Sequence, residues 1–230
     1  MSQGYFVVGT DTGVGKTTVA VALIHALRQR GLRVVGMKPV AAGGEMVNGV
    51  WRNEDVAALA TASNTEADFR LVNPYAFALP IAPHIAAKQT GVVIDIPTIR
   101  SAYDVLSRTA DVVVVESVGG FCVPLGRDID TADLAVALGL PVMMVVGMRL
   151  GCLSHALLTA EAIERRGLVW AGWVANVLDP AMPALNENIA ALQERLGAEC
   201  LGIMPNIRPH SAHPECSWLV PDAFPQLVNK

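Results

Sequence analysis

The sequence lacks the features of a secreted, disulfide-linked or zinc-binding protein. Its few cysteines lie far apart, and no two of them form a C-x-x-C pair, which fits neither a zinc site nor a disulfide framework. The chain begins with a strand-like apolar segment, without a basic leader or a cleavable apolar stretch. We therefore expect a protein of the reducing cytoplasm. The cysteines are Cys122, Cys152, Cys200 and Cys216.

Basic charge and long apolar runs are also scarce. Lys and Arg number 17 against 21 Asp and Glu, which gives a formal net charge of −4. Without a basic stripe to displace counterions from phosphates, nucleic acid is excluded as a partner. A membrane-spanning helix needs about 20 consecutive apolar residues, and the longest runs here are broken by Asp133, Arg149 or Asn176. We expect no membrane partner either.

What the sequence does contain is a large apolar fraction. Hydrophobic residues make up 52% of the 230 residues, and the mean hydropathy is +0.41, values that exclude intrinsic disorder. This length accommodates one domain with one core, and it is too short for two enzyme domains of ordinary size. The apolar excess favours strands buried on both faces, as in a parallel sheet covered by helices.

Short apolar runs alternate with longer amphipathic segments along most of the chain. Four of the amphipathic segments are followed by a glycine, which can adopt the left-handed conformation that ends a helix. The alternation predicts one doubly wound, mainly parallel α/β domain over residues 1–230, with helices on both faces. The predicted strands cover residues 5–8, 33–37, 112–115, 142–146, 169–174 and 200–204, and the predicted helices cover residues 16–30, 95–110, 131–138, 153–166 and 183–196.

Two segments do not follow this alternation. Residues 41–94 are rich in Gly, Asn and Pro, and we expect them to form a long functional excursion beyond the carboxyl edge of the sheet, with one helix over residues 53–62. Residues 206–230 are rich in proline, and we expect an irregular surface tail.

The strongest chemical signal is the segment GTDTGVGKTT at residues 9–18, between a predicted strand and a predicted helix. Its glycines free peptide N–H groups for phosphate oxygens, Lys16 can reach the outer phosphates, and the Thr17 hydroxyl can hold Mg²⁺. Five residues separate Gly9 from Gly15, one more than the usual phosphate loop has. The alternative is a glycine-rich turn, which the flanking strand and helix disfavour.

Three further residues are candidates for the same site. Glu116 follows four valines, so it is either paired with a cation or placed at a strand end, where it could help to hold Mg²⁺. Lys38 follows the second predicted strand and precedes a proline, at the edge where ligands of α/β folds bind, although a solvated surface lysine explains it equally well. For Asp55, spacing alone favours an ordinary carboxylate in the first turn of a helix.

Taken together, GTDTGVGKT, KPVAAG, RNED, VNPYAF with PHIAA, VESVGG, VVGMRLGCLSHALLT and AGWVAN resemble the dethiobiotin synthetases over residues 5–205. The lengthened phosphate loop is typical of that family. The resemblance implies a homodimeric P-loop enzyme that converts 7,8-diaminononanoate, CO₂ and MgATP into dethiobiotin, ADP and phosphate. It further implies an N7-carbamate and a carbamic-phosphoric anhydride as intermediates.

The resemblance also implies roles for individual residues. Mg²⁺ would lie between Thr17, Asp55 and Glu116, and the catalytic residues would be Lys16, Lys38 and Thr12. The substrate would contact Thr12 and Lys38 in one subunit and the helix start formed by Leu150, Gly151 and Cys152 in the other. ATP would be bound by Gly13, Val14, Gly15, Lys16, Thr17, Thr18, Asp55, Glu116, Gly119, Asn176, which reads the adenine, and Pro205.

Several positions depart from the family pattern, and most of them are expected substrate contacts, whereas the lysines and the magnesium ligands match the pattern. Ala42 replaces a serine, Gly13 stands where some members have glutamate, Ser154 replaces an asparagine, and Leu79 and Ala82 replace polar residues. Two related P-loop classes are alternatives. An amidotransferase-like ligase would need an additional glutamine-hydrolysing domain, and a partition-type ATPase usually carries an extra lysine early in the loop.

Overall fold

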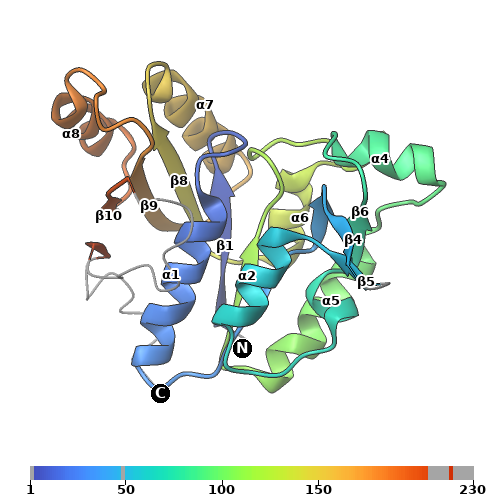
Figure 1. Ribbon diagram of the computed structural model, residues 1–230. Coiled ribbons are helices and arrows are strands. Elements are labelled where there is room, and N and C mark those ends of the chain that lie inside the picture. Colours follow the sequence, from blue (N-terminus) through green and yellow to red (C-terminus); the bar gives the residue numbers. More distant parts are fainter. Residues whose placement is uncertain (1–2, 48–49, 207–217, 220–230) are drawn as a thin grey trace.

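A six-stranded parallel sheet forms the centre of the computed structural model, which describes residues 3–47, 50–206 and 218–219. The strand order is β10-β9-β8-β1-β7-β2 (Figure 1). This sheet confirms the predicted fold class, and each of the six predicted sheet strands is present. The bounds are β1 (Gln3–Gly9), β2 (Val34–Met37), β7 (Val112–Glu116), β8 (Val142–Met148), β9 (Trp170–Val177) and β10 (Cys200–Met204).

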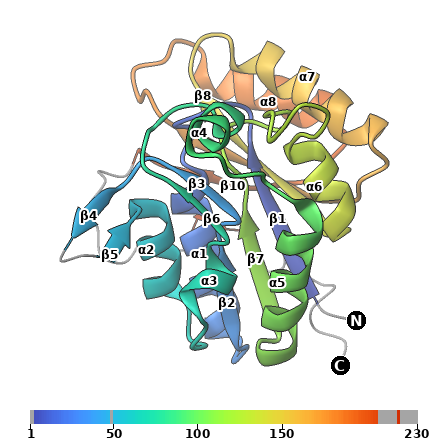
Figure 2. The same cartoon turned by 90° about the vertical axis from the view of Figure 1, so that its right-hand side faces the viewer.

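Helices cover both faces of the sheet. Strand β7 is therefore buried on both faces, which explains why it consists of a continuous run of valines. Val113 and Val115 belong to the apolar core on one face, and Val112 and Val114 belong to the core on the other. In Figure 2, α5 and α6 lie beside β7 and β1. The helices are α1 (Lys16–Gln29) and α2 (Glu54–Ala62), which both contribute to the second core, and α5 (Ile96–Thr109), α6 (Thr131–Leu138), α7 (Cys152–Arg165) and α8 (Leu185–Arg195), which contribute to the first.

The excursion at residues 41–94 holds more regular structure than the sequence predicted. Helix α2 confirms the expected helix, but the prediction of a single helix was wrong. The helices α3 and α4 were missed because α3 has only four residues and α4 begins at a proline in a proline-rich stretch. The added elements are the parallel pair β3 (Val40–Ala42) and β6 (Tyr75–Phe77), the hairpin β4 (Glu45–Val47) and β5 (Val50–Arg52), α3 (Phe69–Val72) and α4 (Pro83–Thr90).

Strand β2 is an edge strand, and the excursion closes its outer side. The Val34 N–H donates to Asn64 Oδ1 at 2.7 Å, and the Gly36 N–H donates to Ser63 Oγ at 2.9 Å. Just past the strand, the Lys38 N–H donates to the Val72 carbonyl at 2.9 Å. Backbone groups that would otherwise be open to another chain are thus satisfied within the chain.

The C-terminal tail differs in one respect from the expected surface segment. Leu219 is buried at 4% exposure and forms an antiparallel bridge with Gly202 of β10. Most of residues 206–230 lie outside the described residues. Within the part of the chain that the structure describes, no helix is long and apolar enough to span a membrane.

Two glycines with positive φ allow a test of the packing around β9. At Gly172 (φ +131°) an added Cβ would lie 2.6 Å from Leu201 Cγ, whereas at Gly139 (φ +65°) it would meet nothing within 4 Å. We predict that Gly139→Ala costs about 1 kcal/mol, from backbone strain alone, and that Gly172→Ala costs about 3 kcal/mol, because overlap is added. Urea unfolding measures both losses, and equal losses would contradict the described packing.

Candidate active site

The phosphate loop at residues 9–15 connects β1 to α1 with the geometry of an anion-binding turn. Gly13 (φ +74°) and Gly15 (φ +88°) are left-handed, and Gly15 caps α1 without any side-chain hydrogen bond to the first turn. The first-turn N–H groups of α1 therefore face the loop without a competing acidic side chain. Lys16 is only 6% exposed, and its Nζ donates to the Asp11 carbonyl at 3.1 Å.

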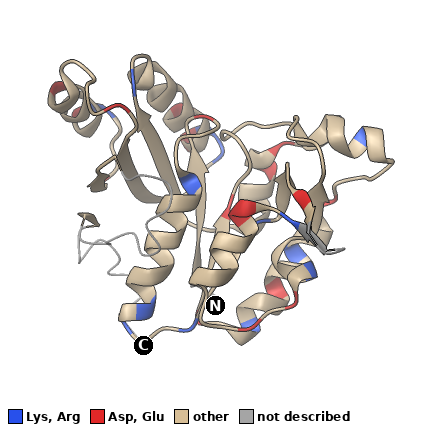
Figure 3. Cartoon of the chain, viewed as in Figure 1, with Lys and Arg blue, Asp and Glu red and all other residues tan. Residues whose placement is uncertain are grey.

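A buried lysine lies next to this loop, between two carboxylates. Lys38 Nζ is 2.5 Å from Glu116 Oε1, 2.9 Å from Asp55 Oδ2 and 3.1 Å from the Ser117 carbonyl. Lys38 is 3% exposed and Glu116 is 1% exposed. Three backbone segments meet here, since Lys38 follows β2, Glu116 ends β7 and Asp55 lies in the first turn of α2. In Figure 3, which has the view of Figure 1, basic colour marks the start of α1 and acidic colour marks the start of α2.

The hydroxyl of Thr17 joins the phosphate loop to this cluster. Thr17 Oγ1 lies 2.7 Å from Asp55 Oδ1 and 2.9 Å from Glu116 Oε1. A hydroxyl carries one hydrogen and can donate to only one of these oxygens at a time. The sequence-predicted metal set is therefore assembled in space, with the Lys38 ammonium as its counterion.

The pKa shifts follow from two carboxylates sharing one lysine. Burial alone would lower the pKa of Lys38, but the charges of Glu116 and Asp55 outweigh it and raise this pKa. For Asp55, burial is likewise outweighed by Lys38 and Thr17, which hold its pKa below the usual value. Burial and the neighbouring Asp55 raise the pKa of Glu116. Lys38 is thus the direct counterion of both carboxylates, and the charge of Lys16 acts on them as well.

The donor atoms at this cluster fit Mg²⁺. Glu116 Oε2 is buried and has no hydrogen-bond partner, so one carboxylate oxygen is unsatisfied where a cation could bind. Two carboxylates and a hydroxyl form an all-oxygen set, which Mg²⁺ prefers. No group of three or more His, Cys, Asp or Glu suited to a metal occurs among residues 3–47, 50–206 and 218–219. A Mg²⁺ ion here would take its other ligands from water or phosphate.

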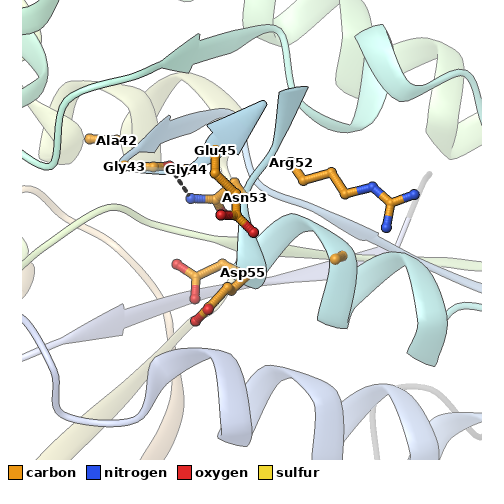
Figure 4. Close-up of a pocket in the computed structure, with 9 residues that line it drawn as sticks. Ala42, Gly43, Gly44, Glu45, Arg52, Asn53 and Asp55 are labelled. Atoms are coloured by element: carbon orange, nitrogen blue, oxygen red, sulfur yellow. Dashed lines mark hydrogen bonds between the residues drawn. The ribbon is translucent and has the colours of Figure 1, made fainter. Parts of the chain in front are cut away.

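A cavity of about 590 Å³ opens beside Asp55 (Figure 4). Its volume is in the range of small-molecule sites. Asn53 fixes its shape, because Nδ2 donates to the Gly43 carbonyl at 2.6 Å and Oδ1 accepts from the Val56 N–H at 3.1 Å. The excursion therefore supplies most of a pocket that adjoins the charged cluster. The lining residues are Ala42, Gly43, Gly44, Glu45, Arg52, Asn53, Glu54, Asp55 and Ala57.

Two known proteins match this chain over most of its length. The ATP-dependent dethiobiotin synthetase BioD of Aromatoleum aromaticum is 56% identical over 205 residues, which cover 89% of this chain and 91% of that protein. The protein of the same name from Nitrosospira multiformis is 53% identical over 219 residues, 95% of each chain. The chain belongs to the dethiobiotin synthetase family. Residues 3–213 also match a broader family described as AAA domain.

A solved structure supports the fold of this synthetase-family chain. The MinD cell division protein of Aquifex aeolicus has a TM-score of 0.59 at 16% identity, and the match covers 99% of this chain and 98% of that one. At this identity the likeness shows the fold alone. It confirms the P-loop NTPase-like architecture that the sequence predicted.

In this member of the family, Asn176 is packed against the phosphate loop. Its side chain is buried, and Nδ2 donates to the Val14 carbonyl at 2.8 Å. A Cβ on Gly15 would lie 2.2 Å from the same nitrogen, so glycine is required there. The second hydrogen of Nδ2 and the acceptor Oδ1 are the groups that the predicted reading of adenine could use. Pro205, the other predicted adenine contact, is exposed one residue beyond β10.

The remaining predicted residues fall into two groups. Gly119 lies close to the phosphate loop, since a Cβ added to it would be 3.7 Å from Thr12 Oγ1; the segment after β7 therefore borders the loop. Thr18 lies in the first turn of α1. At the start of α7, Leu150 is 98% exposed, whereas Cys152 is 2% exposed and its side chain belongs to the core. Any ligand contact of Cys152 would therefore be made by its backbone.

Sequence reasoning missed two contacts of this site. The Ser117 carbonyl accepts from Lys38, and no side-chain pattern reveals a backbone acceptor. Arg149, at the carboxyl end of β8, forms an ion pair with Asp11 of the phosphate loop. Its position after a strand, like that of Lys38, is the signal that could have indicated it.

Nucleotide binding should take up a proton at alkaline pH. Burial and the charge of Lys38 lower the pKa of Lys16 from 10.5 to about 8, so above this pH Lys16 is mostly neutral in the free protein. Phosphate oxygens favour the charged form and raise this pKa again. Calorimetry with a non-hydrolysable ATP analogue, in buffers of different ionisation enthalpy, should show uptake of up to about one proton near pH 9 and almost none near pH 7.

Lys16→Arg is the matched control, because a guanidinium stays protonated at both pH values. Uptake in the variant equal to that of the wild type would contradict the assignment to Lys16.

Proposed function

We propose that this chain is an ATP- and Mg²⁺-dependent dethiobiotin synthetase that acts on 7,8-diaminononanoate and CO₂. The observation that carries the proposal is the buried Lys38 ammonium, held by Glu116 and Asp55 beside the phosphate loop. A second cation, Lys16, lies at the same loop. The names of relatives at 53–56% identity support the same reaction.

The chemistry requires an activated carboxyl group. The N7 amine adds to CO₂ and loses a proton, which gives a carbamate; its oxygen then bonds to the γ-phosphorus of ATP while the bond to the β-phosphate oxygen breaks. The N8 amine attacks the carbamoyl carbon, phosphate leaves, and loss of a proton completes the five-membered urea ring. No covalent step on the protein is needed, so its task is positioning and charge neutralisation.

The residues divide this task between the two reactants. Lys16 would neutralise the outer phosphates, and Lys38 would hold the carbamate oxygen against the γ-phosphate, with Thr12 beside them. Thr17, Asp55 and Glu116 would hold Mg²⁺, which supplies positive charge to the phosphate oxygens when bound. The cavity of the excursion would receive the diamine.

A homodimer completes the proposed site. Leu150, at 98% exposure, lies two residues before α7, and Leu158, at 63%, lies midway along it; two exposed apolar side chains suit a subunit contact. The capping residue Gly151 makes no side-chain cap, so the first turn of α7 could receive the distal carboxylate of the partner's substrate.

The free thiols of Cys122, Cys152 and Cys200 support a reducing cytoplasm. We further propose that residues 1–230 form one domain.

The direct test is reaction stoichiometry with the wild-type protein. We expect ATP hydrolysis to require both 7,8-diaminononanoate and bicarbonate, with one ADP released per dethiobiotin formed. ADP release and product mass measure the two quantities. ATP hydrolysis that proceeds equally without the diamine would overturn the proposal and favour a switch ATPase of the MinD type.

Lys38 can be tested separately from the stability of its ion pair. Lys38→Met should lower kcat by at least about 100-fold and cost about 3–5 kcal/mol of stability, because it leaves Glu116 buried and unpaired. The double variant Lys38→Met/Glu116→Gln should regain much of the stability without regaining activity. Thermal unfolding measures the change in stability, and steady-state kinetics measures the change in kcat. Near-normal turnover in either folded variant would reject the role of Lys38.

A further inference from the structure

The backbone at Lys38 is held by contacts that lie outside the charged cluster. Pairing between β2 and β7 ends at Met37, and the following Pro39 has no N–H to donate. Beyond Met37, hydrogen bonds to residues 72–75 hold the backbone in place. The Lys38 N–H donates to the Val72 carbonyl at 2.9 Å, and the Lys38 carbonyl accepts from Asn73 Nδ2 at 2.6 Å.

Asn73 is placed to act only as a donor. It is 4% exposed, and Nδ2 also lies 3.1 Å from the Tyr75 carbonyl. Because two carbonyl oxygens face one atom of the amide, that atom must be the nitrogen. Asn73 Oδ1 is buried without a hydrogen-bond partner, which costs stability. The side-chain amide of Asn73 therefore contributes favourably to stability only through its NH₂ group, which donates to the backbone carbonyl of Lys38.

We propose that Asn73 is a positioning residue for the reaction. Its side-chain amide fixes the Lys38 backbone, and so fixes the starting point of a long flexible side chain whose Nζ must meet Glu116, Asp55 and the reacting groups. A misplacement of about 1 Å at a reacting group can cost about 100-fold in rate. This inference rests on the proposed function, in which Lys38 holds the carbamate.

The test compares Asn73→Ala with the matched control Asn64→Ala in the full chain. Asn64 likewise binds backbone at the other end of β2, through Val34 of the strand and Leu32 just before it. We expect Asn73→Ala to lower kcat by about 10- to 100-fold and to leave the KM for ATP within about twofold, because the phosphate loop is untouched. Asn64→Ala should keep both values within about twofold at a similar loss of melting temperature.

The ratio of ADP released to dethiobiotin formed separates positioning from general destabilisation. A misplaced Lys38 should raise this ratio above one, because ATP is hydrolysed without a held carbamate, whereas a smaller folded fraction lowers both products equally. Should Asn73→Ala not fold, Asn73→Leu is measured instead, since it removes both the donor and the unpaired acceptor at similar volume. An unchanged ratio and kcat in the folded variant would overturn the proposal.

A readout independent of activity keeps this test apart from that of the proposed function. In a crystal structure of the variant, Lys38 Nζ should be displaced by about 1 Å or more from its position between Glu116 and Asp55. An unmoved Nζ would overturn the role of Asn73 whether or not the wild-type protein makes dethiobiotin.

Discussion

A buried carboxylate at one edge of the sheet, Glu116, lies beside the partly exposed Asp55 and requires a cation, and this requirement organises the site. Glu116 ends a strand with no access to water, and Asp55 enters from a helix on another segment. An isolated charge in such a place would be very costly. Lys38 compensates it in the free protein, and the unpaired Glu116 Oε2 leaves room for further positive charge. In the proposed function, this is where the Mg²⁺ of MgATP would add positive charge.

The rest of the fold can be understood as the support for this arrangement. The parallel sheet brings the ends of β1, β2 and β7 to one edge, as in other α/β ligand sites. The excursion then performs three tasks: it closes the outer side of β2, supplies Asp55 and lines the adjoining cavity. Because these tasks share the segment of residues 41–94, changes in the excursion are expected to affect substrate binding and catalysis together.

The sequence predicted the sheet well because each strand carries its own signal. In the run of residues 112–115 every side chain enters one of two cores, and Gly13 and Gly15 mark the phosphate loop through backbone freedom. Inside the excursion, short strands and a four-residue helix have too few residues for any periodicity, so they were missed. Spacing alone also favoured an ordinary role for Asp55, because only tertiary structure shows that it meets Lys38 and Thr17. The donor role of Asn73 depends on a backbone carbonyl, which no residue pattern encodes.

The central claim is that Lys38, which pairs with the two carboxylates in the free protein, holds the carbamate oxygen against the γ-phosphate in the reacting complex. A crystal structure with Mg²⁺, a non-hydrolysable ATP analogue and 7,8-diaminononanoate tests it most directly. The account predicts the metal between Thr17, Asp55 and Glu116, with Lys38 Nζ about 3 Å from a γ-phosphate oxygen. A triphosphate bound elsewhere, or a Lys38 still paired only with Glu116 and Asp55 in that complex, would contradict it.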